Sequence, residues 1–397
     1  MGTCCSKREV VTVTSNRRQS LVSRRGSIFL EKFSKQADYK KKYEYISMLG
    51  NGGFGKVRLY RDKISKDMKF AIKTIKKDFL NPHSLKSLED EVSILRTLDH
   101  PNIVKYFETY EDDFYIHIVM EYIPGDNLFK VITNRKYNQF SERDASEILN
   151  FLFKAILFLH KNKIVHRDIK PENILFSMPG KYESLRVIDF GLSVTSAKGK
   201  DKYRVGSPYY MAPEMLEGSY TFETDVWSMG VILYVMMTGL QPFQGQNQDE
   251  VFGNISRGIY DVKILDKQKC SKEVKDLIKK LLVLDPRRRM SLEAAMEHPW
   301  ITMHHANNDK DLKSTFDDGI IDSIRSFATN NPLQKEILFY LAKISNESEI
   351  IKLKQAFLQI DTDNTGTIEF EEVVQVFNKL GIQPDKVRIG LKLIIIY

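Results

Sequence analysis

Glycines are spaced at one place in the chain as a phosphate-binding loop requires. Gly50, Gly52 and Gly55, with Val57 after them, follow the pattern G-x-G-x-x-G-x-V. Glycine is needed in such a loop because the backbone must lie close over a triphosphate, and a Cβ would obstruct that approach. Dinucleotide-binding folds use a similar spacing, and a plain glycine-rich turn is a further alternative. The loop alone therefore does not fix the chemistry.

A lysine in an apolar run follows the glycine loop. Ala71 and Lys73 lie in the next segment that the pattern predicts as a strand, where the Lys73 ammonium can reach the α- and β-phosphates of a nucleotide. Glu91 lies in a helical pattern at 87–98 and is the natural ion-pair partner of this lysine. Without the other motifs, a lysine in such a strand would more often be a solvent-exposed residue of an edge strand than a phosphate ligand.

Three further motifs follow the glycine loop and the lysine along the chain. They are HRDIKPEN at 166–173, DFG at 189–191 and MAPE at 211–214. Together with the loop and the lysine, they resemble the signature set of the protein kinases over about residues 44–301. The resemblance implies a serine/threonine protein kinase that moves the γ-phosphoryl group of Mg-ATP to a protein hydroxyl.

The resemblance also implies roles for individual residues. Asp168 orients the proton of the substrate hydroxyl, and Lys170 neutralises charge on the phosphoryl group in flight. Asn173 and Asp189 hold magnesium, and the ion on Asp189 bridges the β- and γ-phosphates. Met120 is the expected gatekeeper beside the adenine. The implied ATP-binding set is Gly50, Asn51, Gly52, Gly53, Phe54, Gly55, Val57, Ala71, Lys73, Glu91, Met120 and the hinge residues Glu121 and Tyr122.

One position departs from the family pattern. Asn127 stands where many protein kinases carry a glutamate that contacts the ribose or a substrate arginine, and Asp126 lies one position early. Glu172 still offers a carboxylate for a basic residue before the target hydroxyl. Protein substrates with basic residues before the serine or threonine are therefore expected. A pseudokinase scaffold is the competing class, but it would need a broken Lys73, Asp168 or Asp189.

The elements that must position these residues fall into two groups. Short β-branched and aromatic runs predict an antiparallel sheet, and amphipathic stretches after it predict a mainly helical second half. The fold class is therefore α+β, a bilobal protein kinase fold at 43–301. The strands are expected at 57–60, 70–75, 104–110 and 115–122, and the helices at 87–98, 145–160, 225–238 and 272–284. Glu214 and Arg289 are expected to form a buried pair, and a polar linker is expected near 303–314.

A calcium-binding loop follows the kinase domain. The twelve residues 361–372 have the form of an EF-hand loop, in which the glycine at position six permits a sharp turn and a bidentate glutamate closes position twelve. The expected ligands are Asp361, Asp363, Thr365, the carbonyl of Thr367 and Glu372. Thr365 offers only a hydroxyl where Asp or Asn is usual, so a modest affinity for Ca²⁺ is expected.

A kinase domain, a helical junction at 302–347 and an EF-hand at 348–383 resemble the calcium-dependent protein kinases. In that family the junction inhibits the kinase and a calcium-loaded EF lobe releases it. Those proteins carry four EF-hands, whereas this chain has one, followed by an atypical tail at 384–397. A truncated reading frame is the favoured interpretation of the tail, with a strand for dimer pairing or an exposed sticky edge as alternatives. A calcium-insensitive kinase with a vestigial EF-hand stays an alternative.

The positive charge of the chain lies in its first 42 residues. This segment holds eleven Lys or Arg and three acids, so it carries the whole net charge of +8. It lacks apolar periodicity and is interpreted as a disordered basic arm that binds an anionic membrane. The neutral remainder gives no electrostatic support for nucleic-acid binding.

The start of the arm matches a lipidation pattern. Gly2 follows the initiator methionine in M-G-x-x-x-[ST], and Cys4 and Cys5 are palmitoylation candidates beside it. Myristate and palmitate together predict a cytoplasmic protein associated with a membrane. Ser20 and Ser27 repeat one pattern, R-R-x-S-apolar, and are candidate phosphosites of an electrostatic switch, although chance occurrence is an equal alternative. The sequence leaves the oligomeric state open.

Overall fold

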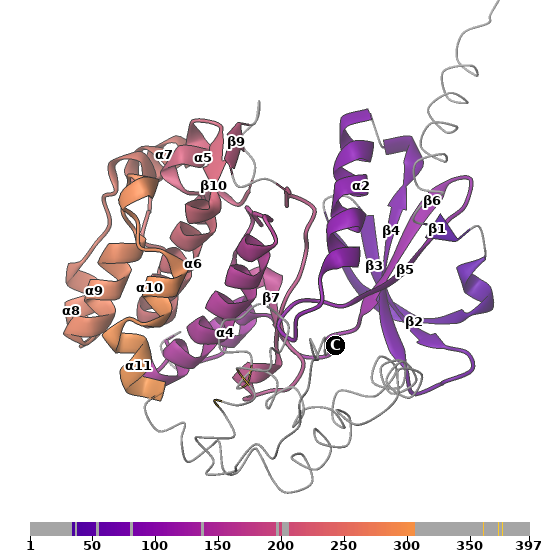
Figure 1. Cartoon of the computed structure of the whole chain (residues 1–397), viewed down its shortest axis with the longest axis horizontal. Helices are drawn as coiled ribbons and strands as arrows, with labels where there is room; N and C mark the ends of the chain where they lie inside the picture. The colour runs from indigo at the N-terminus through magenta and orange to yellow at the C-terminus, as the bar shows by residue number, and fades with distance from the viewer. Residues whose placement is uncertain are drawn as a thin grey trace, which may run out of the picture. The chain divides into compact units, whose positions relative to one another are not determined.

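The computed structural model describes residues 34–35, 38–52, 55–79, 82–135, 139–195, 198–200 and 206–305, together with Ile360, Glu372 and Gln375. The chain forms two compact units (Figure 1). The first comprises the described residues up to Ser93 together with Tyr106–Met120, and the second comprises Ile94–Lys105 and the described residues from Glu121 onward. Within the described ranges, no helix is long and apolar enough to cross a membrane.

The first unit is built on a six-stranded sheet with the strand order β1-β5-β6-β4-β3-β2. The strands are β1 (Ser34–Lys35), β2 (Tyr43–Gly52), β3 (Gly55–Asp62), β4 (Lys69–Lys76), β5 (Tyr106–Glu111) and β6 (Tyr115–Glu121). The pairs β2–β3, β3–β4 and β5–β6 are antiparallel as predicted, whereas the two-residue β1 pairs in parallel with β5. The turn η2 (Lys77–Phe79) and the helix α2 (Pro82–Thr97) follow β4.

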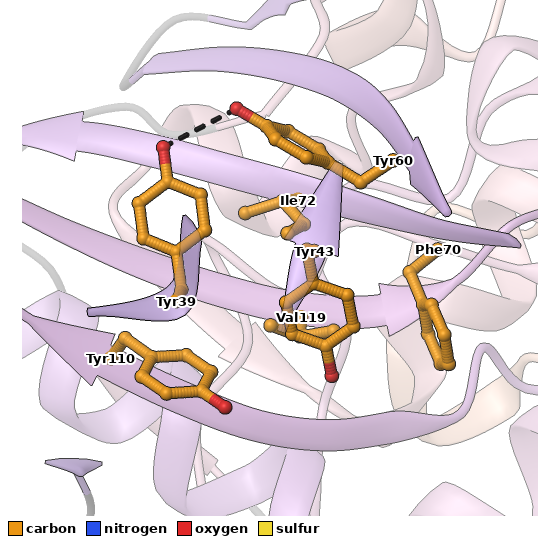
Figure 2. Close-up of a cluster of buried hydrophobic side chains, with 7 residues drawn as sticks. All are labelled: Tyr39, Tyr43, Tyr60, Phe70, Ile72, Tyr110 and Val119. Atoms are coloured by element: carbon orange, nitrogen blue, oxygen red, sulfur yellow. Dashed lines mark hydrogen bonds between the residues drawn. The ribbon is translucent and has the colours of Figure 1, made fainter. Parts of the chain in front are cut away.

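The sheet has an apolar cluster on each face because side chains alternate along a strand. One cluster comprises Tyr39, Tyr43, Tyr60, Phe70, Ile72, Tyr110 and Val119 (Figure 2). On the other face, Ile75 and Ile118 pack with Leu88 and Val92 of α2. Lys73 lies two residues before Ile75 and therefore on the face that carries α2.

The expectation that a disordered arm reaches residue 42 is wrong for residues 34–35, which form β1, and for residues 38–42. Tyr39 begins the turn η1 (Tyr39–Lys41) and is only 7% exposed. Its hydroxyl lies 3.3 Å from that of Tyr60, and the two rings meet edge to face (Figure 2). Lys42 adds an ion pair of 2.8 Å with Glu108. One buried aromatic side chain among lysines makes no periodic pattern, so its burial could not be inferred from the sequence.

The second unit is mainly helical, as predicted. Its helices are α3 (Leu128–Thr133), α4 (Glu142–Lys161), α5 (Pro213–Leu216), α6 (Phe222–Thr238), α7 (Gln248–Arg257), α8 (Lys263–Lys267), α9 (Lys272–Leu281), α10 (Leu292–Met296) and α11 (Pro299–His305). Its short strands form the pairs β7 (Ile174–Phe176) with β8 (Leu185–Val187) and β9 (Lys198–Lys200) with β10 (Ser219–Thr221). The 3-10 turns are η4 (Pro171–Asn173), η5 (Tyr182–Ser184), η6 (Pro208–Tyr210) and η7 (Pro286–Arg288).

Helix α6 is the core of this unit. It is apolar all round, and every residue from Thr224 to Thr238 is buried, as expected of a helix enclosed by others. Helices α4 and α9 both pack against it (Figure 1). The helix ends at Gly239, whose φ of +72° suits a left-handed C-cap.

The linker predicted from residue 303 begins later. Helix α11 continues through His305, because it is fixed to α4 from both ends. The indole Nε1 of Trp300 donates to Glu142 at 2.7 Å, and Nε2 of His305 lies 3.3 Å from the hydroxyl of Ser146. The folded C-terminal boundary of the kinase unit therefore includes residues 303–305.

Candidate active site

A buried ion pair joins β4 to α2 in the first unit. The ammonium of Lys73 lies 2.6 Å from Oε1 of Glu91, and the two side chains are only 9% and 5% exposed. Removing two charges from water is costly, so such a pair is weak evidence for stability. It does hold the lysine in one orientation. The predicted partnership of Lys73 with Glu91 is present.

The glycine-rich loop is the connection of β2 to β3. Gly50 pairs with Val57 and Gly52 with Gly55, and the ladder is irregular between Met48 and Gly50. A Cβ on Gly55 would collide with the backbone carbonyl oxygen of Thr74, so this glycine is required by the close approach of β4. Gly53 and Phe54, which form the tip, lie outside the described residues.

In the second unit, Asp225 fixes the backbone on which the HRD motif stands. Its Oδ2 accepts from the amide of His166 at 3.0 Å, and its Oδ1 accepts from the amide of Arg167 at 2.9 Å. Burial pushes the pKa of Asp225 upward, but its hydrogen bond to His160 and its electrostatic interactions with His160 and His166 outweigh burial, so the pKa lies below its ordinary value. Arg167 adopts φ of +66°, a strained conformation that this anchoring maintains.

Asp168 is the centre of a hydrogen-bonded group. Its Oδ2 accepts from the ammonium of Lys170 at 2.6 Å and from Nδ2 of Asn173 at 3.0 Å. The same amide nitrogen of Asn173 donates to the Asp168 carbonyl at 2.9 Å. The structure therefore brings together three residues that the sequence placed at the catalytic centre.

Ser207 is a further member of the group that was not predicted. Its hydroxyl donates to Oδ1 of Asp168 at 2.8 Å and accepts from Lys170 at 2.7 Å. Gly206 makes the approach possible, since it has φ of +107° and a Cβ there would lie 2.9 Å from the Arg167 carbonyl oxygen. The only signal in the sequence is a hydroxyl residue bracketed by glycine and proline shortly before MAPE.

Two oxygen donors fit a magnesium ion. Because Nδ2 of Asn173 is turned to Asp168, its Oδ1 is directed to the other side of the amide. Asp189 is exposed with φ of +64°, while the neighbouring Phe190 is buried against His166. No cluster of three or more His, Cys, Asp or Glu occurs in the part of the chain that the structure describes. Magnesium usually takes few protein ligands together with substrate phosphates, so Asn173 with Asp189 suits it.

The expected hinge contains the point where the chain passes from the first unit to the second. Met120 ends the first unit and packs with the Ile75 and Ile118 cluster. The carboxylate of Glu121 is held in the second unit by the Lys105 amide at 3.1 Å and by Nε of Arg186 at 3.2 Å. The Glu121 amide also donates to the Lys105 carbonyl at 2.9 Å, so the groups suited to a base edge are the Glu121 carbonyl and the backbone of Tyr122.

Asp126 and Glu172 are the acidic side chains that the sequence offers for a basic substrate residue. Asn127 is the N-cap of α3, where its Oδ1 accepts from the Lys130 amide at 2.9 Å. Asp126 lies 3.4 Å from the Lys130 ammonium, and both side chains are exposed. Glu172 is exposed on η4. Asn127 is thus a structural cap rather than a charged contact.

A second buried pair, between Glu214 and Arg289, confirms another prediction. The guanidinium binds the carboxylate through two hydrogen bonds of 2.8 and 3.0 Å, and Arg289 lies over the Trp227 ring. It joins α5 to the segment after η7. The ion pair is therefore structural and takes no part in phosphoryl transfer.

Several predicted residues lie outside the described residues. They are the calcium ligands Asp361, Asp363, Thr365 and Thr367, the lipidation residues Gly2, Cys4 and Cys5, and the candidate phosphosites Ser20 and Ser27. Within the EF-hand, Glu372 is helical and 6% exposed, and Ile360 is helical and 2% exposed. The junction beyond His305 and the tail at 384–397 are also outside.

Comparison with protein families matches two parts of the chain. Residues 43–301 match the protein kinase domain, and residues 352–381 match the EF-hand domain. The chain therefore belongs to the protein kinase family, and the bilobal fold class is confirmed. Its members use ATP with Mg²⁺, and the EF-hand implies Ca²⁺.

Curated relatives include several calcium-dependent protein kinases. Calcium-dependent protein kinase 4 of Arabidopsis thaliana is 39% identical over 336 residues, which is 84% of this chain and 66% of the relative. Calcium-dependent protein kinase 4 of Plasmodium falciparum is 36% identical over 348 residues, 86% of this chain and 65% of the relative. The chain thus spans less than two thirds of the length of these relatives. Its resemblance to the calcium-dependent protein kinases is confirmed.

Proposed function

We propose that the chain is a serine/threonine protein kinase that transfers the γ-phosphoryl group of Mg-ATP to a protein hydroxyl. The observation that carries the proposal is the set of contacts to Asp168. Lys170, Asn173 and Ser207 engage its carboxylate at 2.6–3.0 Å, so its orientation is fixed before a substrate arrives. Preorganisation of this kind is the main protein contribution to phosphoryl transfer.

The residues divide the work by their chemistry. Asp168 orients the attacking hydroxyl. Lys170 lies beside Asp168 and offsets the negative charge that develops on the transferred group. Lys73, held by Glu91, binds the α- and β-phosphates. Asn173 and Asp189 hold magnesium, which supplies charge neutralisation at the β- and γ-phosphates.

Replacement of Asp189 by Asn tests this assignment. The variant keeps the shape of the side chain but loses its charge toward magnesium, so magnesium-dependent transfer to a mixture of basic peptides should fall by roughly a hundredfold or more. Circular dichroism should be unchanged. Undiminished transfer would contradict the role of Asp189, and wild-type protein that binds ATP without transfer would favour the pseudokinase alternative.

Calcium control is the second part of the proposal. It is supported by the EF-hand match, by the names of the relatives and by the buried helical position of Glu372 at the end of the loop. Inhibition by the junction is tested with a chain that ends after His305, because α11 belongs to the folded unit. That chain should be as fast without calcium as the full chain is with it. Equal rates of the full chain with calcium and with chelator would favour the vestigial EF-hand.

Membrane attachment is the third part, with a cytoplasmic location beside the membrane. It is supported by the myristoylation pattern at Gly2, by Cys4 and Cys5, and by the basic arm. One acyl chain binds a bilayer only marginally, so the basic residues and palmitate supply the second signal. A Gly2→Ala chain expressed beside wild type should not incorporate a myristate analogue and should move to the soluble fraction.

A preference for basic residues before the target hydroxyl is the fourth part. The exposed carboxylate of Glu172 supports this preference. Asp126 is paired with Lys130 and Asn127 caps α3, so these two residues add little to the binding of a basic substrate residue. Replacement of Glu172 by Gln should raise KM for basic peptides more than it lowers kcat. Equal KM values for wild type and variant would remove the preference.

A further inference from the structure

The turn between β3 and β4 presents one apolar side chain to solvent. The amide of Asp62 donates to the Met68 carbonyl at 2.9 Å and closes the turn. The buried carboxylate of Asp62 accepts from the amides of Ile64 and Ser65 at 2.8 and 3.0 Å. Ile64 is 92% exposed, the highest exposed fraction among the large hydrophobic side chains that the structure describes. The turn is therefore closed by its own hydrogen bonds, with Ile64 at its surface.

Exposed lysines from two segments of the chain belong to the same surface as Ile64. Lys63 and Lys66 lie in the turn itself and are exposed. The ammonium of Lys63 donates to the Lys40 carbonyl at 2.6 Å, and its amide donates to the Lys42 carbonyl at 2.9 Å. These bonds join the turn to the segment at 38–42. We call the resulting surface the basic tip, defined as Lys40, Lys41, Lys63, Ile64 and Lys66.

Acidic residues near the basic tip do not cancel its charge. Asp62 is buried within the turn, and Glu44 forms an exposed ion pair of 2.9 Å with Arg61. In residues 38–44 and 61–69, six lysines are exposed, of which Lys42 is paired with the buried Glu108, against three exposed acids. The lysines are Lys40, Lys41, Lys42, Lys63, Lys66 and Lys69, and the acids are Asp38, Glu44 and Asp67. The exposed charge of this surface is therefore positive.

The basic tip is also fixed to the end of the basic arm. Tyr39 is buried in the aromatic cluster with Tyr60 and Tyr43, so residues 38–42 are part of the sheet's packing (Figure 2). The arm that carries the remaining positive charge precedes residue 38. Residues 34–35 of the arm form β1, which pairs with β5 at one edge of the sheet, so the end of the arm and the basic tip belong to the same unit.

We propose that the basic tip is a second membrane contact, in which lysines bind anionic headgroups and Ile64 enters the headgroup region. The inference rests on the proposed membrane attachment of the arm. A single exposed apolar side chain flanked by lysines in one turn suits a leaflet, which needs an apolar wedge and positive charge. A protein partner would need a broader apolar centre.

A tryptophan reporter tests whether Ile64 meets lipid. The two native tryptophans, Trp227 and Trp300, are fully buried, so a tryptophan at an exposed position is distinguishable from them. The Ile64→Trp full chain should show a blue-shifted emission with vesicles of phosphatidylcholine and phosphatidylserine, and quenching by lipids brominated on the acyl chains. Ile259→Trp, at a site that is 55% exposed in the second unit, is the matched control and should show neither.

Vesicle binding tests the lysines. In the Gly2→Ala full chain, Lys66→Gln should weaken binding to the same vesicles by about fivefold at moderate salt, because each basic residue near an anionic leaflet contributes about that factor. Lys279→Gln, an exposed lysine of α9, is the matched control and should leave binding unchanged. Kinase activity in solution should be unaltered by both.

The outcomes separate this inference from the proposed attachment. If the wild-type chain, acylated or not, ignores anionic vesicles, the attachment and the basic tip both fail. If it binds them but Lys66→Gln binds equally and Ile64→Trp shows no shift, only the basic tip is overturned. A shift of Ile64→Trp emission with polyglutamate but not with vesicles would overturn it in favour of an acidic protein partner.

Discussion

The hydroxyl of Ser207 donates to Oδ1 of Asp168 at 2.8 Å, while it accepts from Lys170 at 2.7 Å. Ser207 thus links the two charged groups expected to act on the transferred phosphoryl group. It also ties them to the segment that ends in MAPE. A residue in this place positions Asp168 and Lys170 without itself donating or accepting the phosphoryl group.

We predict that Ser207→Ala lowers kcat by about tenfold or more, since both charged side chains lose a fixed hydrogen-bond partner. Ser207→Thr keeps the hydroxyl and should retain most of the activity. Steady-state kinetics with a basic peptide measure both. If Ala and Thr variants match wild type in kcat, the hydroxyl has no positioning role.

Glu91→Gln should mainly affect the binding and use of ATP. The carboxylate lies 2.6 Å from the Lys73 ammonium in a buried setting, so loss of its charge leaves Lys73 less firmly oriented toward the phosphates. We expect kcat/KM for ATP to fall by about tenfold or more, with little change for the peptide. Glu89→Gln, two residues earlier on the same helix, is the control. An unchanged kcat/KM for ATP would contradict the predicted role of the pair.

Partners that the resemblance to protein kinases names could be predicted even when far apart, as Glu214 and Arg289 are, whereas contacts that no motif marks could not. HRDIKPEN holds Asp168, Lys170 and Asn173 within six positions, and the resemblance to protein kinases assigns all three to the catalytic centre. Ser207 reaches Asp168 only because Gly206 lets two distant segments approach closely. The strand and helix periods likewise predicted the Lys73 and Glu91 elements, but not that α2 begins at Pro82.

The burial of Tyr39 shows the same limit. No pattern in a lysine-rich segment distinguishes a tyrosine that packs into a sheet from one in solvent, because the distinction depends on Tyr60 and Tyr110 from other strands. Charge and composition alone therefore extended the predicted arm to residue 42. The lysines around Tyr39 are exposed, as their composition predicts.

Tyr39→Ala should destabilise the first unit by about 3–5 kcal/mol, the usual cost of deleting a buried aromatic side chain. Tyr39→Phe keeps the ring and loses only the hydroxyl contact with Tyr60, so it should cost about 1 kcal/mol or less. Denaturant unfolding measures the two free energies. If Tyr39→Ala lowers the free energy of unfolding no more than Tyr39→Phe does, residues 38–42 are not part of the core.

Glu372→Gln should weaken calcium binding by about tenfold or more, because position twelve of an EF-hand supplies two of the ligand oxygens. Calorimetry of the full chain with Ca²⁺ measures the change. Glu371→Gln, the adjacent carboxylate outside the ligand pattern, is the control and should bind as wild type does. Equal affinities of the two variants would contradict the EF-hand ligand set.

The central claim is tested most directly by transfer of labelled γ-phosphate from Mg-ATP to a basic peptide, followed by identification of the phosphorylated amino acid. The wild-type chain should produce phosphoserine or phosphothreonine, and Asp168→Asn should lower the rate by roughly a thousandfold with no loss of folded structure. Transfer by Asp168→Asn at the wild-type rate, or phosphotyrosine as the product, would contradict the account.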